Sequence, residues 1–346
     1  MATIKDIARA AGVSNTTVSN VVHGKGSHVS PETVARIHKI IQELGYVPNM
    51  SARALVSNRS KVVAIINHIV PKQSDGVLAD PFHSAFISAI EERLRNSGYY
   101  LMLRTVEDAR ALRVFLDNWN LDGLFLTGVF EDEFCETLTR LDKPTVLIDS
   151  YLHNYHHMYN VGLEDFQGGY IATQYLLANG HRRIAFACPP LREGGVVWER
   201  LRGYRKALEE AGVTPDPALI FQKEFTTHGT MALGAELAKR RDFTAIFATA
   251  DIMAAGIMSG LQQAGCRVPE DISIVGFDDI NWCRMTKPML TTVHQDATLK
   301  GETAADFMIR LLQGDPPRMR SAILPVGLTV RDSVRLLRDT EKTVQE

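Results

Sequence analysis

Acidic and aromatic side chains stand at the ends of several apolar stretches, in a pattern suited to binding a small polyol. Because ligands of open parallel sheets bind beyond the carboxyl ends of the strands, the residues that end or follow predicted strands should meet at one site. Carboxylates accept pairs of hydroxyl hydrogens, an arginine fork adds donors, and an aromatic ring covers the flat side of a sugar. The predicted site contains Asn67, His68, Phe82, Asp149, Trp198, Arg200, Phe225, Asp251 and Asp278. A sugar is the favoured ligand, with a purine next.

The residues of this predicted site do not form a recognisable catalytic arrangement. Asp278 and Asp279 are paired acids, but adjacent residues point in different directions and cannot readily flank one bond. Glycine-rich phosphate loops and the HExxH and GxSxG motifs are absent from the sequence. His153 and His157 lie four apart without a helical pattern, so no metal site is predicted. We therefore expect no enzyme, no cofactor and no metal.

Some of these residues also have structural alternatives. Asp251 precedes a helical pattern and could serve only as its cap. Asp278 and Asp279 could be loop carboxylates in water, although the predicted arginine and aromatic neighbours favour a binding role.

A second set of polar residues lies near the N-terminus, in the stretch GVSNTTVSNVVHGKG of residues 12–26. Three valines recur there at helical spacing, which turns outward the small polar residues Asn15, Thr16, Ser19 and Asn20. Asparagine offers a donor and an acceptor to adenine, and threonine offers a hydroxyl and a methyl to thymine. This nearly uncharged face favours contact with base edges in a DNA major groove. The alternative is a capped surface helix without a ligand.

Two further helices are predicted around this one. Thr3 and Asp6 resemble a capping box for a helix over residues 4–11, which Gly12 ends, and Ser14 can cap the second helix. Ser30, Pro31 and Glu32 open a third helix that Gly45 closes. Its inward stripe is predicted to be Val34, Ile37, Ile40, Ile41 and Leu44. Two short helices joined by a glycine turn and completed by a longer third helix form a helix-turn-helix arrangement.

The next stretch, YVPNMSARALVSNRS of residues 46–60, predicts a short helix that is marginal alone in water. Pro48 and Asn49 can start it. Small Ala52 beside apolar Leu55 suits close approach to a minor groove, with Leu55 wedged between base steps. The alternative is an ordinary linker helix that rests on the next domain.

Charge separates this N-terminal segment from the rest of the chain. Residues 1–60 hold seven Lys or Arg and three acids, a net charge of +4, whereas the remainder holds 31 basic and 37 acidic residues, a net charge of −6. A basic head on an acidic body predicts a polyanion partner for the head alone. Phosphate contacts are predicted for Lys5, Arg36, Arg53 and Arg59.

Composition and length predict a cytoplasmic globular protein of two or three domains. Of 346 residues, 45% are apolar and 23% are charged. No apolar run is long enough to span a bilayer, and the charged start MATIKDIARA does not fit a secretory peptide. The cysteines are widely separated, which is consistent with free thiols in a reducing compartment.

From residue 62 onward, apolar strand patterns alternate with amphipathic helices. This alternation predicts parallel βαβ units that are covered on both faces. The strands fall into two series, 62–70, 99–105, 122–129 and 144–150, then 182–190, 219–225, 244–251 and 272–279. We therefore predict an all-α helix-turn-helix head followed by a bilobal α/β body with two doubly wound parallel sheets.

Long ordered motifs give the chain a resemblance to a known family. TIKDIARAAGVSNTTVSNVVHG, SPETVARIHKIIQELGYVPN and SARAL in the head, and GYIATQYLLANGHRRIAF, VPEDISIVGFDD and LTTVHQD in the body, resemble the lactose-repressor (LacI/GalR) family of bacterial transcription regulators. The resemblance spans nearly the whole chain. It implies an effector domain with the type I periplasmic-binding-protein fold, and chain crossovers near Val161, near Leu290 and around residue 320.

The resemblance also implies roles for individual residues. Asn15, Thr16 and Asn20 match the family's principal base-reading positions, and Leu55 matches the leucine that intercalates at the operator centre. The full set of predicted DNA contacts is Thr3, Lys5, Ser14, Asn15, Thr16, Thr17, Ser19, Asn20, His23, Ser30, Arg36, Asn49, Ala52, Arg53 and Leu55. Arg200 and Asp278 match the family's frequent effector contacts. Asp149, Phe225 and Ala250 match others, and Ala250 is small where a polar residue often stands.

The sequence thus predicts an allosteric repressor. Its partners are a near-palindromic double-stranded DNA operator, a small-molecule effector and a second copy of the chain, without a membrane. The predicted domains are 1–47 (helix-turn-helix), 48–60 (hinge helix and linker), 61–335 (effector binding and dimerisation) and 336–346 (tail). Within 61–335, the N-lobe is predicted at about 61–160 and 293–320, and the C-lobe at about 161–290 and 321–335. The alternatives are an exported-type solute-binding protein and a sugar-modifying α/β enzyme.

Overall fold

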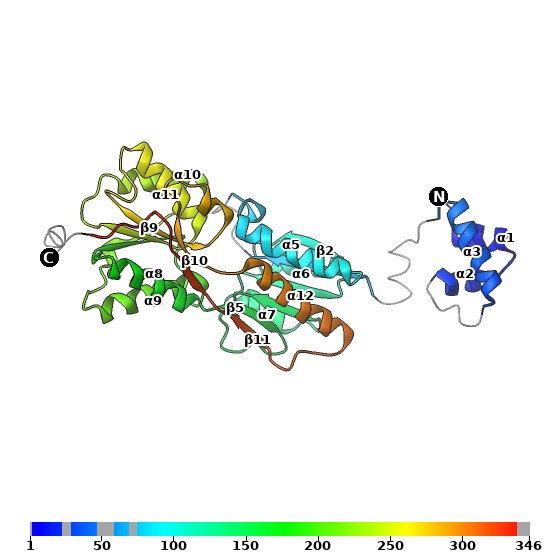
Figure 1. Cartoon of the computed structure of the whole chain (residues 1–346). Helices are drawn as coiled ribbons and strands as arrows, with labels where there is room; N and C mark the ends of the chain where they lie inside the picture. Colours follow the sequence, from blue (N-terminus) through cyan, green and yellow to red (C-terminus); the bar gives the residue numbers. More distant parts are fainter. Residues whose placement is uncertain (1, 23–28, 47–58, 69–74, 338–346) are drawn as a thin grey trace. The chain divides into compact units, whose positions relative to one another are not determined.

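The computed structural model describes residues 2–22, 29–46, 59–68 and 75–337. The chain divides into two compact units, Met1–Ser60 and Lys61–Glu346, which we call the head and the body (Figure 1). None of the helices in the described residues is long and apolar enough to cross a membrane.

The head is built from the three predicted helices. They are α1 (Ile4–Ala11), α2 (Asn15–Val22) and α3 (Pro31–Glu43). Their small core consists of Ile7, Ala8, Ala11, Val18, Val21 and Ile37. The predicted inward position of Leu44 is wrong, because this side chain is 43% exposed. Leu44 lies just beyond the end of α3. The helices α1 and α2 have only eight residues each and are too short to cover this position. Tyr46 packs against the core instead.

The N-lobe of the body holds a six-stranded sheet in the order β11-β5-β4-β3-β1-β2. All its strand pairs are parallel. The strands are β1 (Val62–Asn67), β2 (Tyr100–Thr105), β3 (Gly123–Thr127), β4 (Thr145–Ile148), β5 (Tyr159–Leu163) and β11 (Ser321–Leu324). The helices are η3 (Val77–Ala79), α5 (Pro81–Asn96), α6 (Ala109–Asn118), α7 (Glu133–Thr139) and α12 (Ala297–Gln313).

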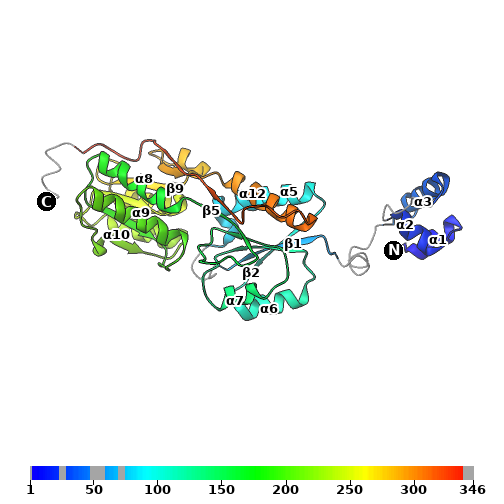
Figure 2. The same cartoon turned by 90° about the horizontal axis from the view of Figure 1, so that it is seen from below.

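Helices cover both faces of this sheet (Figure 2). In β1, Val63 and Ile65 pack in the cluster that includes residues of α5 and α12, whereas Ala64 and Ile66 pack with residues of α6 and α7. Because alternate side chains of a strand point to opposite faces, a strand buried on both faces must be apolar throughout. This explains the continuous apolar runs of the sequence.

The C-lobe repeats the design with the order β12-β10-β9-β8-β6-β7, in which only β12 is antiparallel to its neighbour. Its strands are β6 (Ile184–Cys188), β7 (Ile220–Gln222), β8 (Ala245–Ala248), β9 (Ser273–Asp278), β10 (Thr291–His294) and β12 (Gly327–Thr329). Its helices are α8 (Asp165–Ala178), α9 (Val196–Glu210), η4 (Pro217–Leu219), α10 (Thr227–Leu237), α11 (Asp251–Gln263) and η5 (Asn281–Arg284). Figure 1 shows α8 and α9 on one face of the sheet and α10 and α11 on the other.

The chain crosses between the lobes three times, each time slightly later than predicted. The crossings follow β5, β10 and β11, whose last residues are Leu163, His294 and Leu324. The predicted boundaries at about 160, 290 and 320 are therefore several residues too early. An apolar run identifies a strand, but only its pairing partner decides which sheet the strand joins.

Candidate DNA-binding face and effector site

Helix caps hold the head's three helices and use several of the predicted DNA contacts. Thr3 and Asp6 form a capping box at the start of α1. Ser14 accepts a hydrogen bond from the backbone N–H of Thr17 at 3.1 Å. Ser30 caps α3 by accepting from the backbone N–H of Thr33. Thr3, Ser14 and Ser30 thus satisfy helix ends, whatever further contact their hydroxyls make, and the hydroxyl of Thr17 pairs with that of Ser14.

The outer face of α2 carries the predicted base-reading residues. Asn15 and Thr16 are exposed, and Ser19 and Asn20 are half-buried, while Val18 and Val21 point into the core. Within the described residues, no hydrogen bond engages the side chains of Asn15, Thr16 or Asn20, so their polar groups remain available to a partner. Lys5 and Arg36 are exposed as well. The predicted contacts His23, Asn49, Ala52, Arg53 and Leu55 lie outside the described residues.

In the body, strand ends deliver three predicted carboxylates to the region where the lobes meet. Asp149 directly follows β4 of the N-lobe, Asp278 ends β9 of the C-lobe, and Asp251 begins α11 just after β8. Asp149 and Asp278 have positive φ angles of 54° and 121°. Few residues other than glycine adopt such conformations, and they cluster at functional sites, where they fix the direction of a side chain.

Arg200, near the start of α9, is held by an ion pair with Asp165 of α8. Its Nε donates to Asp165 Oδ1 at 2.8 Å, its Nη1 donates to the carbonyl of Thr249 at 2.6 Å, and its guanidinium stacks 3.5 Å from the centre of the Phe277 ring. Tyr151, from the N-lobe, donates its hydroxyl to Asp165 Oδ2 at 2.5 Å. The arginine fork is therefore fixed in one orientation before any ligand arrives.

Two glycines allow this ion pair to form. A Cβ on Gly169 of α8 would come within 2.0 Å of the carbonyl oxygen of Arg200, and a Cβ on Gly203 of α9 would come equally close to that of Phe166. Only glycine permits α8 and α9 to pack this closely. The close approach brings Arg200 against Asp165.

A second ion pair joins Asp149 to Lys300 of α12. Lys300 Nζ lies 2.7 Å from both carboxylate oxygens of Asp149 and 2.9 Å from Gln295 Oε1. Gln295 Nε2 in turn donates to Asp278 Oδ1 at 2.6 Å. The polar groups of the two lobes are thus connected through the crossover that follows β10.

Burial changes the protonation of this cluster. It raises the pKa of Asp278 well above its usual range, and the charge of Arg200 opposes this rise. Burial disfavours the charged form of Arg200, but the carboxylates of Asp165, Asp278 and Asp149 outweigh it and keep the pKa of Arg200 above its ordinary value. Arg200 therefore stays a cation in the site, while Asp278 binds a proton more readily than an exposed aspartate.

Asp251 has an internal role. Its carboxylate accepts from the backbone N–H of Ile280, from Cys283 Sγ and from the hydroxyl of Thr292, and the residue is 1% exposed. Burial raises its pKa to about 7, against the effect of these hydrogen bonds. Since the carboxylate already accepts three hydrogen bonds, Asp251 anchors α11 to β10 and η5, and we do not place it among the ligand contacts.

The other predicted effector residues differ in their burial and in their contacts. Asn67 is buried and accepts from Thr127, and His68 stacks on Phe134 with 4.0 Å between ring centres. Phe82 is nearly buried, with Lys300 Nζ 5.1 Å from its ring centre. Ala250 is buried as well. Trp198 and Phe225 are half-buried.

Contacts between side chains also link the lobes away from this cluster. Asp75 of the N-lobe accepts from the backbone N–H and hydroxyl of Thr227 at the start of α10, at 2.8 and 2.7 Å. Arg192 of the C-lobe pairs with Asp132 of the N-lobe and stacks 3.7 Å from the centre of the Phe130 ring. These pairs depend on the relative position of the lobes, so lobe movement would make or break them.

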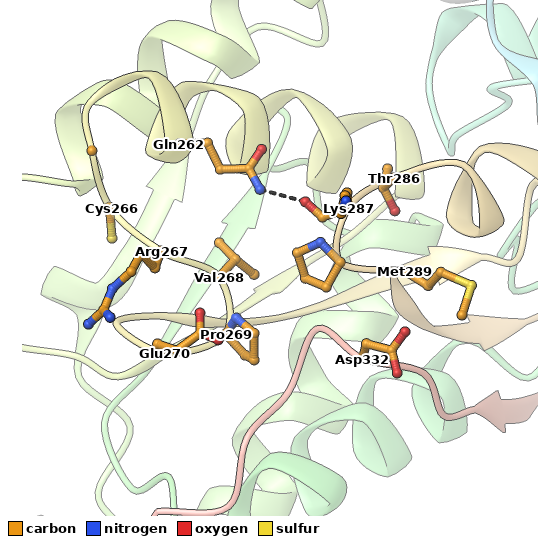
Figure 3. Close-up of a pocket in the computed structure, with 12 residues that line it drawn as sticks. Gln262, Cys266, Arg267, Val268, Pro269, Glu270, Thr286, Lys287, Met289 and Asp332 are labelled. Carbon is orange, nitrogen blue, oxygen red and sulfur yellow. Dashed lines mark hydrogen bonds between the residues drawn. The ribbon is translucent and has the colours of Figure 1, made fainter.

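A surface hollow of about 910 Å³ lies elsewhere in the C-lobe. Figure 3 shows it between the end of α11, where Gln262 bonds the carbonyl of Lys287 at 2.6 Å, and the loop that carries Arg267. This loop precedes β9 and Met289 precedes β10, so the hollow lies at the amino ends of the strands. None of the predicted effector residues lines it.

Sequence reasoning missed four residues of the polar cluster: Tyr151, Asp165, Gln295 and Lys300. The sequence does contain a signal for Lys300, because this residue lies on the buried stripe of α12 with Gly301, Ala304, Ala305 and Met308. A lysine that is buried on an apolar stripe loses its hydration. This costs a high free energy unless the ammonium gains a charged or hydrogen-bonding partner. Asp165 and Tyr151 had no comparable signal.

Comparisons with known proteins agree with this architecture. Residues 3–49 match the family described as bacterial regulatory proteins, lacI family, and residues 173–334 match a periplasmic binding protein-like domain. The HTH-type transcriptional regulator CelR of Thermobifida fusca is 34% identical over 96% of this chain and 98% of its own length. The HTH-type transcriptional repressor PurR of Photobacterium profundum is 33% identical over 97% and 99%. The chain belongs to the lacI family.

Solved structures of this family superpose on the chain. The Lac repressor dimer bound to operator and the anti-inducer ONPF matches with a TM-score of 0.83 and 27% identity, over 96% of this chain and 99% of that one. A complex of the transcriptional regulator CelR with cellobiose matches with a TM-score of 0.71 and 30% identity, over 96% and 100%. These relatives are transcriptional regulators and not enzymes, so the predicted fold class and the prediction of a DNA-binding regulator are confirmed.

Proposed function

We propose that the chain is a repressor that binds a near-palindromic operator as a homodimer and changes its operator affinity when a sugar binds at the strand ends of the body. The observation that carries this proposal is the convergence of Asp149, Arg200 and Asp278 from both lobes. Two acceptors and a fixed donor fork match the paired hydroxyls of a sugar. Trp198 and Phe225 offer apolar surface for a ring.

Relatives support the sugar and the dimer. CelR was solved with cellobiose, and a LacI family regulator from Enterococcus faecium, which matches with a TM-score of 0.70 and 27% identity over 80% of this chain, was solved with ribose. The Lac repressor was solved as a dimer on its operator. A dimer places two α2 helices in successive major grooves, which explains a near-palindromic site. The chain would act in the cytoplasm, with the DNA.

Contacts between the two lobes would couple sugar binding to operator affinity. A sugar that binds both lobes favours one relative lobe position, and with it pairs such as Arg192 with Asp132. In this proposal, residues 48–60, outside the described residues except for Arg59 and Ser60, form the hinge that either packs into the minor groove or separates from it. Operator and sugar must then change each other's affinity by the same factor.

A selection experiment tests the DNA-binding half of the proposal. The purified full-length chain is used to select from randomised double-stranded DNA at physiological ionic strength. We expect enrichment of a site with two inverted half-sites. Enrichment of no sequence, or of a single half-site bound by a monomer in sedimentation analysis, would contradict it.

A thermal-shift screen tests the effector half, because a ligand that binds only the native state raises the melting temperature. The panel contains neutral mono- and disaccharides, including cellobiose and ribose, with purine bases as the competing class. We expect a sugar to raise the melting temperature and to change the affinity for the selected operator. A purine base that does both, with no active sugar, would overturn the sugar assignment.

A further inference from the structure

Lys300 is the most deeply buried cation of the polar cluster. Its side chain is 1% exposed, although its charge lies beside Asp149, whose side chain is 18% exposed. All three N–H groups of its ammonium have partners: both oxygens of Asp149 at 2.7 Å and Gln295 Oε1 at 2.9 Å. The lysine therefore has no donor left for a ligand, and its role must pass through the groups it holds.

One of these groups is the amide of Gln295. Because Lys300 donates to Oε1, the amide must present Nε2 to its other neighbour, and it donates to Asp278 Oδ1 at 2.6 Å. Lys300 thus fixes the direction of a hydrogen-bond chain that begins on α12 of the N-lobe and ends at β9 of the C-lobe. Without the lysine, the amide could turn and offer its oxygen to Asp278.

The second group is Asp149. Each of its oxygens accepts one bond from Lys300 and keeps a further lone pair for a hydroxyl hydrogen. Asp278 likewise uses only Oδ1 toward Gln295. Both carboxyl groups are thus held in position, and each keeps hydrogen-bonding capacity for a ligand.

The donors available to a ligand are few. Arg200 donates from Nε to Asp165 and from Nη1 to Thr249, and its Nη2 lies 2.8 Å from Asp165 Oδ1, so only part of its five N–H groups remains without a hydrogen-bond partner among the described residues. An anionic group that reached them would come close to the carboxylate of Asp149, whose charge also acts on Arg200. Like charges in a partly buried site repel strongly.

We propose that Lys300 is a specificity-determining positioning residue, which holds Asp149 and Gln295 so that the site accepts a neutral polyol and excludes the sugar acid or sugar phosphate of the same shape. This inference rests on the proposed function, since it concerns the ligand of the same site. It adds the charge class of the ligand and the residue that sets it.

Titratable groups on several elements lie around this cluster. They are Asp80 and His83 at the start of α5, Tyr151 after β4, Asp165 on α8, Arg200 on α9, Asp251 on α11 and Asp278 on β9. The test therefore compares ligands at one fixed pH, so that only the charge of the ligand and of the substituted residue changes.

The experiment measures binding to the full-length chain by calorimetry, using matched pairs of probes: cellobiose with cellobionate, ribose with ribose 5-phosphate, and glucose with glucose 6-phosphate and gluconate. For the wild type, we expect at least one neutral sugar to bind and its anionic partner to bind at least ~10-fold more weakly, the equivalent of ~1.4 kcal/mol. We call the ratio of the two dissociation constants the charge selectivity.

Three variants then test the residue. K300M should weaken binding of the neutral sugar by ~10-fold or more, because Asp149 and Gln295 lose the group that orients them. D149N should lower the charge selectivity, because it removes a negative charge and leaves that of Lys300. K300M/D149N should return the charge selectivity toward the wild-type value, because both charges are gone. A general loss of structure would lower both affinities and leave this ratio unmoved.

Lys143 provides a matched control. It is a half-buried lysine of the same lobe that donates to the carbonyl of Leu121, and K143M should leave both affinities unchanged. The melting temperature and operator affinity of each variant show whether it is folded.

The outcomes separate the inference from the function on which it rests. Binding of the anionic partner as tightly as the neutral sugar, or a charge selectivity that D149N and K300M/D149N leave unchanged, overturns the inference alone. Binding of no probe by the wild type counts against a sugar effector, and the inference fails with it. If K300M does not fold, the comparison of D149N with K300M/D149N still decides the question.

Discussion

The head and the body of this protein use polar side chains in opposite ways. On α2 of the head, Asn15, Thr16 and Asn20 make no side-chain hydrogen bond within the described residues, and a core of six small or aliphatic residues holds the helix behind them. In the body, Asp149 and Arg200 are each held by an ion pair before a ligand arrives. DNA can be read by side chains that adjust at a surface, whereas a buried ligand needs groups that are already in place.

The largest effect is expected for R200A. Removing the arginine leaves Asp165 buried without its charge partner, which should lower the free energy of unfolding of the body by about 3–5 kcal/mol. We expect the sugar response to disappear, while operator binding without sugar persists because the head has its own core. Denaturant unfolding and operator titrations measure the two effects.

The control for R200A lies two residues away. Arg202 pairs with Glu199 on the surface, where its side chain is 56% exposed, and such pairs contribute little. R202A should therefore leave stability and sugar response unchanged. An R200A protein that still responds to sugar would remove Arg200 from the site.

A second test uses His181, which is fully buried in the body between Thr244 Oγ1 and the carbonyl of Arg335. Burial lowers its pKa to about 4 from an ordinary value of 6.5. A lowered pKa means that the unfolded chain takes up the proton first, so the stabilisation is complete above pH 6.5 and is lost as the pH falls toward 4. The loss should reach up to ~3 kcal/mol.

The measurement compares denaturant unfolding of the wild type and H181Q at pH 7 and pH 4.5. The difference between the two proteins should shrink at the lower pH. H157Q, which changes an exposed histidine, provides the control. A difference that is independent of pH would show that His181 does not stay neutral in the fold.

For the head, N20A should weaken operator binding by about 1–3 kcal/mol and relax the preference at one base of each half-site, without a change in folding. The measurement is a repeat of the operator selection with the variant. Q42A, on the exposed side of α3, should select the same sequence as the wild type. An unchanged preference in N20A would leave α2 without its proposed role at that base.

The smallest expected effect concerns the cap of α3. S30A should destabilise this helix by about 1 kcal/mol, because the N–H of Thr33 loses its acceptor. Faster hydrogen exchange of α3 in the full-length chain reports the change, and S30D should reverse it because aspartate also caps helices. Equal exchange rates in S30A and the wild type would mean that the cap does not limit the opening of α3.

Local patterns were enough to predict much of this molecule. The caps at Thr3 and Ser30 and the valine stripe of α2 depend only on neighbours a few residues apart, and the structure has them as expected. The apolar strands were also evident, because burial on both faces leaves no polar positions. Leu44 was misplaced, because its exposure depends on how far two other helices reach.

The proposed ligand site was harder to predict because its partners are distant in sequence. Asp149 and Lys300 are 151 residues apart, and Arg200 and Thr249 are 49 apart. Strand ends correctly pointed to a common region, yet nothing in the sequence near Asp251 shows that Ile280, Cys283 and Thr292 occupy its carboxylate.

The sequence by itself determined the elements of the fold, the free polar face of α2 and the family, since each is written in short-range periodicity or in long ordered motifs. Tertiary structure alone decided which sheet each crossover strand joins and which charges pair. The physical reason is that an ion pair buried between helices depends on the close approach of backbones, as at Gly169 and Gly203, and only the packed fold sets that distance.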